Sequence, residues 1–174
     1  WALKNKRFDV ILKLIFLELI RKPTWFNIDK IMDINDEHGI KSTFFWLVNQ
    51  GKTNMKKGIK NADYNFKNNN IQKQLKRIKN RGFYNGLHKS ISKESFSSEI
   101  NKLGFVPVSN RNHYLLLSIP EHYKELDKAN IEIDFSLGFA EHFGFRNSYG
   151  LPFKPFNLNT NSTHNVLEVP LSIM

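Results

Sequence analysis

Short apolar runs of strand length alternate with helical segments along this chain, and that alternation limits the folds open to it. Strands are predicted at residues 42–48, 84–88, 131–135 and 166–173. Helices are predicted at residues 7–20, 27–39, 71–81, 92–104 and 120–129. Strands that alternate with helices favour a parallel sheet over an antiparallel one. The predicted fold class is therefore α/β, with mainly parallel strands that form a sheet or a partial (β/α) barrel.

The remaining segments are predicted to be irregular or only briefly extended. Residues 105–108 are expected to be extended, and residues 114–117 are apolar again. Residues 49–69 form a long polar segment, and residues 138–156 are rich in aromatic residues, glycine and proline. A chain of 174 residues suits one domain rather than two. Because the chain begins at Trp1 and ends within an apolar run, we expect it to be a segment of a longer protein.

Several protein classes are excluded by composition. The chain has no cysteine, which excludes disulfide scaffolds, Cys-ligated zinc or iron–sulfur centres and thiol nucleophiles. Its longest apolar run, residues 10–20, is interrupted by Lys13 and Glu18 and is too short to span a bilayer, so no transmembrane segment is expected. No signal peptide is visible, which favours the cytoplasm, although a chain without cysteine suits either redox environment.

Positive charge is concentrated in one part of the chain. The formal net charge is +10, and residues 51–93 hold 12 basic residues against the single acid Asp63. Such a block can bind phosphate or an anionic glycan, or it can be a solvated lysine-rich surface. Nucleic acid is not an expected partner, because most of the bases are lysines and no recognisable nucleic-acid-binding module accompanies them.

Two segments carry residues suited to chemistry beside predicted strands. His88 lies at the end of the strand 84–88, where metal ligands and catalytic bases gather in parallel α/β folds; a surface histidine is the alternative. Arg111, His113 and Tyr114 place a cation, an imidazole and a phenol within one turn. They could bind a carboxylate or contact a sugar, or Arg111 could pair with a structural acid while Tyr114 packs inward.

Two further candidates lie towards the carboxyl terminus. Asp134 lies in an apolar strand, where it could pair with the cationic site and acquire a depressed pKa, or simply cap the following turn. Phe145 and Arg146 lie among aromatic residues that could stack on sugars or belong to the core. The chain has no phosphate-binding loop, nucleophile elbow, zinc-protease motif or dinucleotide fingerprint, so nucleotide hydrolysis, serine hydrolysis and hydride transfer are not expected.

Taken in order, these segments resemble the polysaccharide deacetylase family with the NodB homology domain, in a divergent bacterial branch. The segments 41–45 and 81–88 are similar to the family's Ala-Thr-Phe-Phe strand and its Gly-His-Glu-Ile-Gly-x-His segment. Residues 111–114 are similar to its Arg-x-Pro-Tyr motif, and residues 134–137 to its Tyr-Asp-x-Ser-Leu strand. Residues 145–146 and 167–171 resemble the branch's Gly-Phe-Arg and Glu-Ile-Pro-Leu elements. The resemblance covers residues 26–174, with residues 1–25 forming a helix and connection before them.

The resemblance implies a distorted (β/α) barrel that removes N-acetyl groups from an amino-sugar polysaccharide with a bound divalent metal, zinc above all. It makes His88 a metal ligand, Arg111 and Asp134 catalytic organisers, and a carbohydrate the substrate. We expect His113, Tyr114, Phe145 and Arg146 to contact that substrate.

The chain also departs from the family pattern. Nothing before residue 42 fits the family's first strand with its Asp pair, and Ser92 and Phe83 stand where two of its histidines would be. His164 is the candidate for its late histidine. Without the first strand an open sheet edge would need a partner or a flanking segment to cover it. The alternative is therefore an inactive deacetylase-type domain that binds an anionic glycan or assembles with other proteins.

Overall fold

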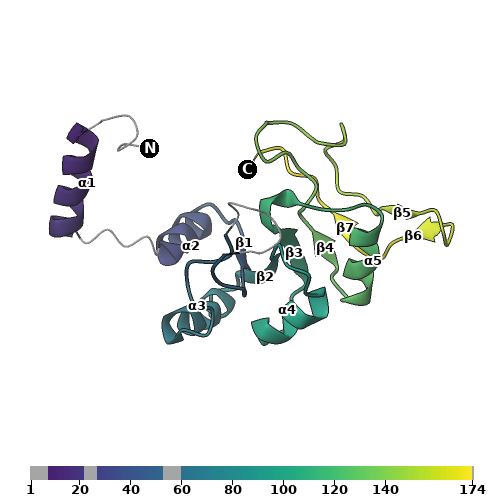
Figure 1. The fold of residues 1–174 in the computed structure, drawn as a ribbon, viewed down its shortest axis with the longest axis horizontal. Coiled ribbons are helices and arrows are strands. Elements are labelled where there is room, and N and C mark those ends of the chain that lie inside the picture. The colour runs from purple at the N-terminus through teal and green to yellow at the C-terminus, as the bar shows by residue number, and fades with distance from the viewer. Residues whose placement is uncertain (1–7, 22–26, 53–59, 174) are drawn as a thin grey trace. The chain divides into compact units, whose positions relative to one another are not determined.

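The computed structural model describes residues 8–21, 27–52 and 60–173, which divide into two compact units (Figure 1). The first unit, Trp1–Ile40, contains α1 (Phe8–Arg21) and α2 (Ile28–Glu37), close to the two helices predicted there. The second unit, Lys41–Met174, contains every strand of the described residues. Among the described residues, no helix combines the length and the apolar character that a bilayer crossing requires.

The second unit is built on a parallel sheet with the strand order β1-β2-β3-β4-β7. Its strands are β1 (Thr43–Trp46), β2 (Tyr84–Lys89), β3 (Ser109–Asn112), β4 (Ile133–Asp134) and β7 (Leu167–Glu168). A separate antiparallel pair, β5 (Phe156–Asn157) and β6 (Ser162–Thr163), lies near the carboxyl terminus. The prediction of an α/β fold with mainly parallel strands is confirmed.

Three helices connect the strands, namely α3 (Asn69–Asn80), α4 (Phe96–Leu103) and α5 (Glu121–Lys128). Helices α3 and α4 begin with a capping side chain, Asn68 and Ser95 respectively. The side chain of Ser95 accepts a hydrogen bond from the backbone N–H of Ser98, which makes Ser95 the cap of α4. Gly104 ends this helix with φ of 79°, a left-handed conformation that glycine adopts without strain.

One face of the sheet, the helix-covered face, packs against these helices. On β2, Asn85 donates a hydrogen bond to the carbonyl oxygen of Leu75 in α3. On β4, Asp134 lies within hydrogen-bond distance of His122 in α5. Because side chains alternate along a strand, the register of the sheet also places Leu87, Asn110 and Glu168 on this face; together with Asp134 these side chains are fully buried.

The opposite face, which we call the histidine face, carries Phe45, His88, Arg111 and Phe135. The rings of Phe45 and Phe135 contact each other edge to face, with centroids 5.6 Å apart. Gly86 lies beneath the Phe45 ring, since a Cβ atom at Gly86 would lie 2.7 Å from ring carbons of Phe45. These four side chains are half-buried, so solvent and ligands can reach them.

The structure differs from the sequence-based prediction at three strands. β3 begins at Ser109, after the expected extended segment 105–108, because Val106 and Val108 are 75% and 51% exposed rather than buried in a strand. Residues 113–115 form a short 3₁₀ helix, η1 (His113–Leu115), instead of an apolar extended run. β4 and β7 pair over only two residues each, so the predicted strands 131–135 and 166–173 were too long.

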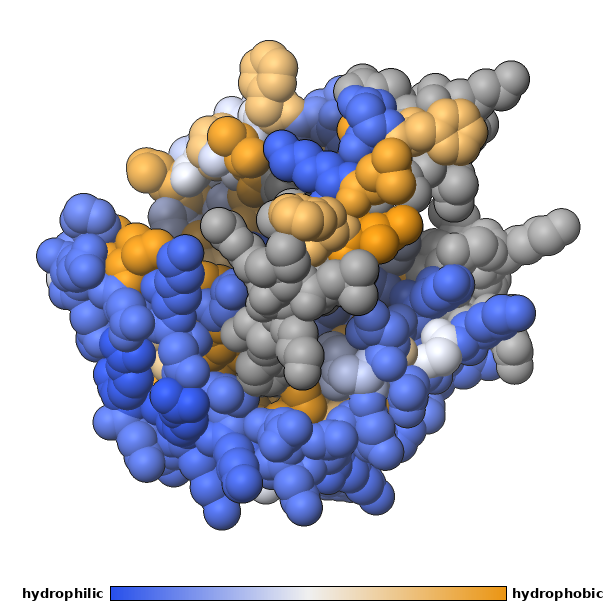
Figure 2. All heavy atoms as spheres, turned by 90° about the vertical axis from the view of Figure 1, so that its left-hand side faces the viewer, coloured by the Kyte–Doolittle hydropathy of each residue, from blue (hydrophilic) through white to orange (hydrophobic). Residues whose placement is uncertain are grey.

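Helix α3 carries much of the basic block. Lys73, Lys76 and Lys79 are exposed on it, while Ile71, Leu75 and Ile78 are buried against the sheet. Figure 2 shows hydrophilic side chains over the lower part of the molecule, the level at which Figure 1 places α3. This part of the basic block is therefore a solvated helix face.

Candidate functional site

Two histidine rings meet at the carboxyl ends of β2 and β3. Nε2 of His88 lies 3.0 Å from Nδ1 of His113, and the ring centroids are 5.0 Å apart. His88 precedes the last residue of β2, and His113 follows β3 directly. Functional side chains gather at the carboxyl ends of parallel strands in open α/β sheets. The structure therefore places His88 close to its expected strand end and adds His113 as its neighbour.

The other nitrogen of His113 determines the proton arrangement of the pair. Nε2 of His113 lies 2.7 Å from the backbone carbonyl oxygen of Lys60. Because a carbonyl oxygen only accepts hydrogen bonds, Nε2 of His113 carries the hydrogen. In the neutral ring, Nδ1 is then unprotonated and accepts a hydrogen bond from Nε2–H of His88. Nδ1 of His88 is then the remaining unprotonated nitrogen of the pair, and it is buried without a hydrogen-bond partner.

Burial lowers the pKa of His88 to about 4. The neighbouring His113 ring lowers this pKa further, and the charge of Arg111 acts in the same direction, while the Arg111 backbone partly offsets them. His88 is therefore neutral near pH 7. A neutral imidazole is the form that binds a metal ion, whereas a base with so low a pKa removes protons weakly.

Arg111 lies beside His88 on the histidine face, because the two residues are register partners in β2 and β3. Its guanidinium carbon lies 5.1 Å from the centroid of the Phe45 ring, within the range of a cation–π interaction. Within the described part of residues 41–174, no carboxylate forms an ion pair with Arg111. Burial lowers the pKa of Arg111 and the charge of Asp134 partly offsets this effect, while the Nε atom of Arg111 is buried without a hydrogen-bond partner.

Asp134 lies on the helix-covered face, away from Arg111. Its carboxylate accepts hydrogen bonds from Nδ2 of Asn110 (2.7 Å) and Oγ of Ser136 (2.9 Å), and Oδ2 lies 2.7 Å from Nε2 of His122. The expected pairing of Asp134 with the cationic site is not found among the described residues. The reason is strand register: Asp134 pairs with Asn110, whose side chain points to the other face from Arg111.

A second buried acid, Glu168, lies beside Asp134 and was not singled out from the sequence. Its Oε1 accepts a hydrogen bond from the backbone N–H of Leu137. Burial, followed by the proximity of Asp134, raises the pKa of Glu168 to about 9. The pKa of the Tyr123 phenol is also raised, first by its burial and then by Glu168. The sequence signal was a single acid within the apolar run 166–171, which indicates a buried acid.

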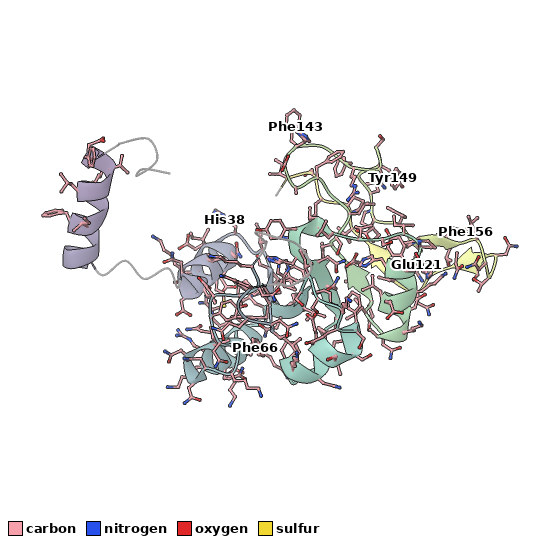
Figure 3. All side chains as sticks on the ribbon, in the orientation of Figure 1. His38, Phe66, Glu121, Phe143, Tyr149 and Phe156 are labelled. Atoms are coloured by element: carbon pink, nitrogen blue, oxygen red, sulfur yellow. The ribbon has the colours of Figure 1, made fainter. Side chains whose placement is uncertain are left out.

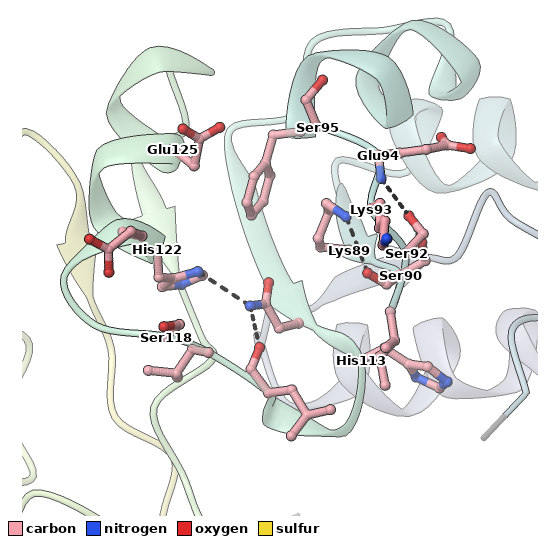
Figure 4. A pocket seen from close by; sticks show the side chains of 16 residues that line it. Lys89, Ser90, Ser92, Lys93, Glu94, Ser95, His113, Ser118, His122 and Glu125 are labelled. Atoms are coloured by element: carbon pink, nitrogen blue, oxygen red, sulfur yellow. Dashed lines mark hydrogen bonds between the residues drawn. The ribbon is translucent and has the colours of Figure 1, made fainter. Parts of the chain in front are cut away.

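A cavity of about 610 Å³ opens between the loops that follow β2 and β3. Figure 4 shows the His113 and His122 rings on opposite sides of it, with serine hydroxyls between the charged side chains. Ser92, which stands where the family pattern has a histidine, lines this cavity and donates a hydrogen bond to Glu99. The cavity lies at the strand ends and is lined by serine hydroxyls and charged groups as well as by apolar side chains, so it offers a ligand both hydrogen bonds and apolar contact.

Tyr114 is the expected substrate-contact residue nearest the histidine pair. It is 48% exposed, and its ring centroid lies 4.6 Å from that of His113. Its backbone has φ of 56°, a left-handed conformation that is uncommon for a residue with a large side chain. The alternative in which Tyr114 packs inward is therefore not observed, and the Tyr114 side chain is accessible.

Phe145 and Arg146 lie in the irregular segment 138–156. The Phe145 ring packs against Gly150, where a Cβ atom would lie 2.6 Å from the ring. Among the described residues, no hydrogen bond, ion pair or ring contact connects Phe145 or Arg146 with the histidine pair. Figure 3 shows Phe143 and Tyr149 extending from the same segment, which places several aromatic side chains on its surface.

His164 is buried rather than positioned on an open polar loop. Its Nδ1 lies 2.6 Å from Oδ2 of Asp127, and the backbone N–H of Asn165 donates to the same carboxylate. No contact in the described residues joins His164 to His88 or His113. His164 therefore connects helix α5 to the segment before β7 through its contact with Asp127.

The described residues contain no group of three or more His, Cys, Asp or Glu side chains that could hold a metal ion. His88 and His113 supply two imidazole nitrogens that face each other, which is half of a tetrahedral zinc site. The donor set of the described residues therefore fits a metal only in part. Comparison with protein-family models, curated proteins and solved structures finds no match to this chain.

Proposed function

We propose that this chain is a deacetylase-type domain that removes N-acetyl groups from an amino-sugar polysaccharide or glycan. The observation that carries the proposal is the His88–His113 pair at the carboxyl ends of β2 and β3, with Arg111 next to it. A parallel sheet with helices α3, α4 and α5 on one face is consistent with part of a distorted (β/α) barrel. The cavity beside His113, which combines serine hydroxyls with apolar side chains, supports a carbohydrate ligand.

The two histidines would be metal ligands in this proposal. The carbonyl oxygen of Lys60 orients His113, and burial keeps His88 in its neutral, ligand-competent form. A divalent metal such as zinc would supply Lewis-acid activation of the amide carbonyl and of water. Arg111 would hold negative charge on the substrate, and Tyr114 would contact a sugar ring.

The direct test is acetate release from N-acetylated chitin oligosaccharides with added zinc or cobalt, and with a chelator. We expect release that depends on metal and is abolished by His88→Ala. Metal binding, measured by calorimetry or by the visible absorption of cobalt, should weaken in both His88→Ala and His113→Ala. His142→Ala, which removes an exposed histidine, is the matched control. Turnover that His88→Ala leaves unchanged would overturn the assignment.

A second candidate function is the binding of an anionic glycan without catalysis. It is favoured by the exposed lysines of α3 and by the incomplete donor set around His88. Retention on heparin that persists with a chelator and disappears at high salt would support this function. Replacing Lys73, Lys76 and Lys79 together by Gln should then abolish retention, whereas the histidine variants should retain it.

A further inference from the structure

Arg111 is a partly buried cation, and the charge of Asp134 acts on it without a direct ion pair between the two side chains. It is half-buried, its Nε has no hydrogen-bond partner, and no carboxylate of the described residues 41–52 and 60–173 pairs with it. A partly desolvated guanidinium without a direct ion pair is unfavourable, and an anion bound from solution relieves that cost.

The groups around Arg111 define what kind of anion fits. Phe45 and Phe135 form an apolar wall on one side, and His88 lies on the neighbouring strand. Among Phe45, His88, Arg111 and Phe135, the side chains that define this face, only Arg111 is a permanent cation. A single cation balances a single negative charge, whereas phosphate carries more than one near pH 7.

We propose that the histidine face binds a monoanionic carboxylate at Arg111, with the adjoining apolar group of the ligand against Phe45 and Phe135. The planar guanidinium matches the two oxygens of a carboxylate. The site does not depend on the proposed function, although acetate, the acid that deacetylation releases, belongs to the same ligand class.

The test follows the imidazole NMR signals of His88 and His113 in the whole chain, with a chelator present and at low ionic strength. Sodium acetate should shift these signals saturably, whereas acetamide, its neutral isostere, should not. Sodium D-glucuronate is the second probe. A response to glucuronate alone indicates a sugar-borne carboxylate, and a response to acetate alone indicates a small free acid; either outcome supports the site.

Three variants distinguish acetate binding at Arg111 from a general effect of positive charge on the protein. Arg111→Gln should weaken acetate binding by at least about tenfold, and Arg111→Lys should weaken it less, because lysine keeps the charge and loses the planar fork. Lys154→Gln removes one exposed positive charge elsewhere and should leave binding unchanged.

The proposal is overturned if neither carboxylate binds, if acetamide acts as acetate does, or if Arg111→Gln and the parent chain bind acetate equally. The comparison of acetate with acetamide needs no variant, so a folding defect in Arg111→Gln does not obscure it. A chain that binds acetate but releases none from chitin oligosaccharides supports this site and argues against the proposed function.

Discussion

Nζ of Lys89 lies 2.7 Å from Oε1 of Glu99, and both side chains are buried between β2 and α4. The Glu99 carboxylate also accepts hydrogen bonds from the backbone N–H and hydroxyl of Ser90 and from the hydroxyl of Ser92. The charge of each partner is thus satisfied within the protein, and α4 is attached to the loop that lines the cavity.

Removing Glu99 should therefore be costly. Glu99→Ala leaves the Lys89 ammonium buried without its counter-ion, and we expect a loss of about 3–5 kcal/mol in the free energy of unfolding, measured in urea. The exposed pair of Glu94 and Lys102, at 2.6 Å, is the control, and Glu94→Ala should cost less than about 1 kcal/mol. Equal losses in the two variants would contradict this prediction.

Glu168 should make the protein less stable as the pH rises. Its pKa in the folded state is about 9, against a normal value of 4.5, so the folded state holds a proton that the unfolded state releases above pH 4.5. The contribution is complete below pH 4.5 and is lost as the pH rises to 9. Glu168→Gln should flatten this decline in urea unfolding at pH 6 and pH 9. The exposed Glu132→Gln is the control, and an unchanged slope in Glu168→Gln would refute the assignment.

His88 should have the opposite dependence on pH. Its pKa falls from 6.5 to about 4 on folding, so the unfolded state takes up a proton first as the pH falls. The stability present above pH 6.5 decreases down to pH 4, by roughly 3 kcal/mol at most. His88→Gln should remove that decrease. In an NMR titration the His88 ring should titrate near pH 4, and titration near 6.5 would show that it is not buried as described.

Gly86 should not tolerate a side chain. A Cβ atom there would lie 2.7 Å from the Phe45 ring and 2.8 Å from Oγ of Ser109. Gly86→Ala should displace the ring on which Arg111 rests, shift the His88 imidazole signals and cost about 1–3 kcal/mol. Phe45→Leu shortens the obstructing ring, so the double variant should lose less than the sum of the single variants. Strictly additive losses would show that the contact with Phe45 is not the cause.

The histidine pair shows which parts of the candidate site could be predicted from the sequence. His88 and the segment 111–114 were candidates because each follows a predicted strand, and the structure brings His88, Arg111 and His113 together. Asp134 was grouped with them for the same reason, but it faces α5. Adjacency of strands could be anticipated, whereas the face to which each side chain points depends on a register that shifts with a single residue.

The sequence by itself determined the α/β class, the mainly parallel sheet and the approximate positions of helices α3, α4 and α5, because apolar periodicity and capping residues are local properties. Only the tertiary structure decided that Glu168 lies beside Asp134, that His164 binds Asp127 and that Arg111 has no carboxylate partner among the described residues 41–52 and 60–173. Those relationships join residues far apart in the chain, and burial and pKa follow from the neighbours that folding brings together.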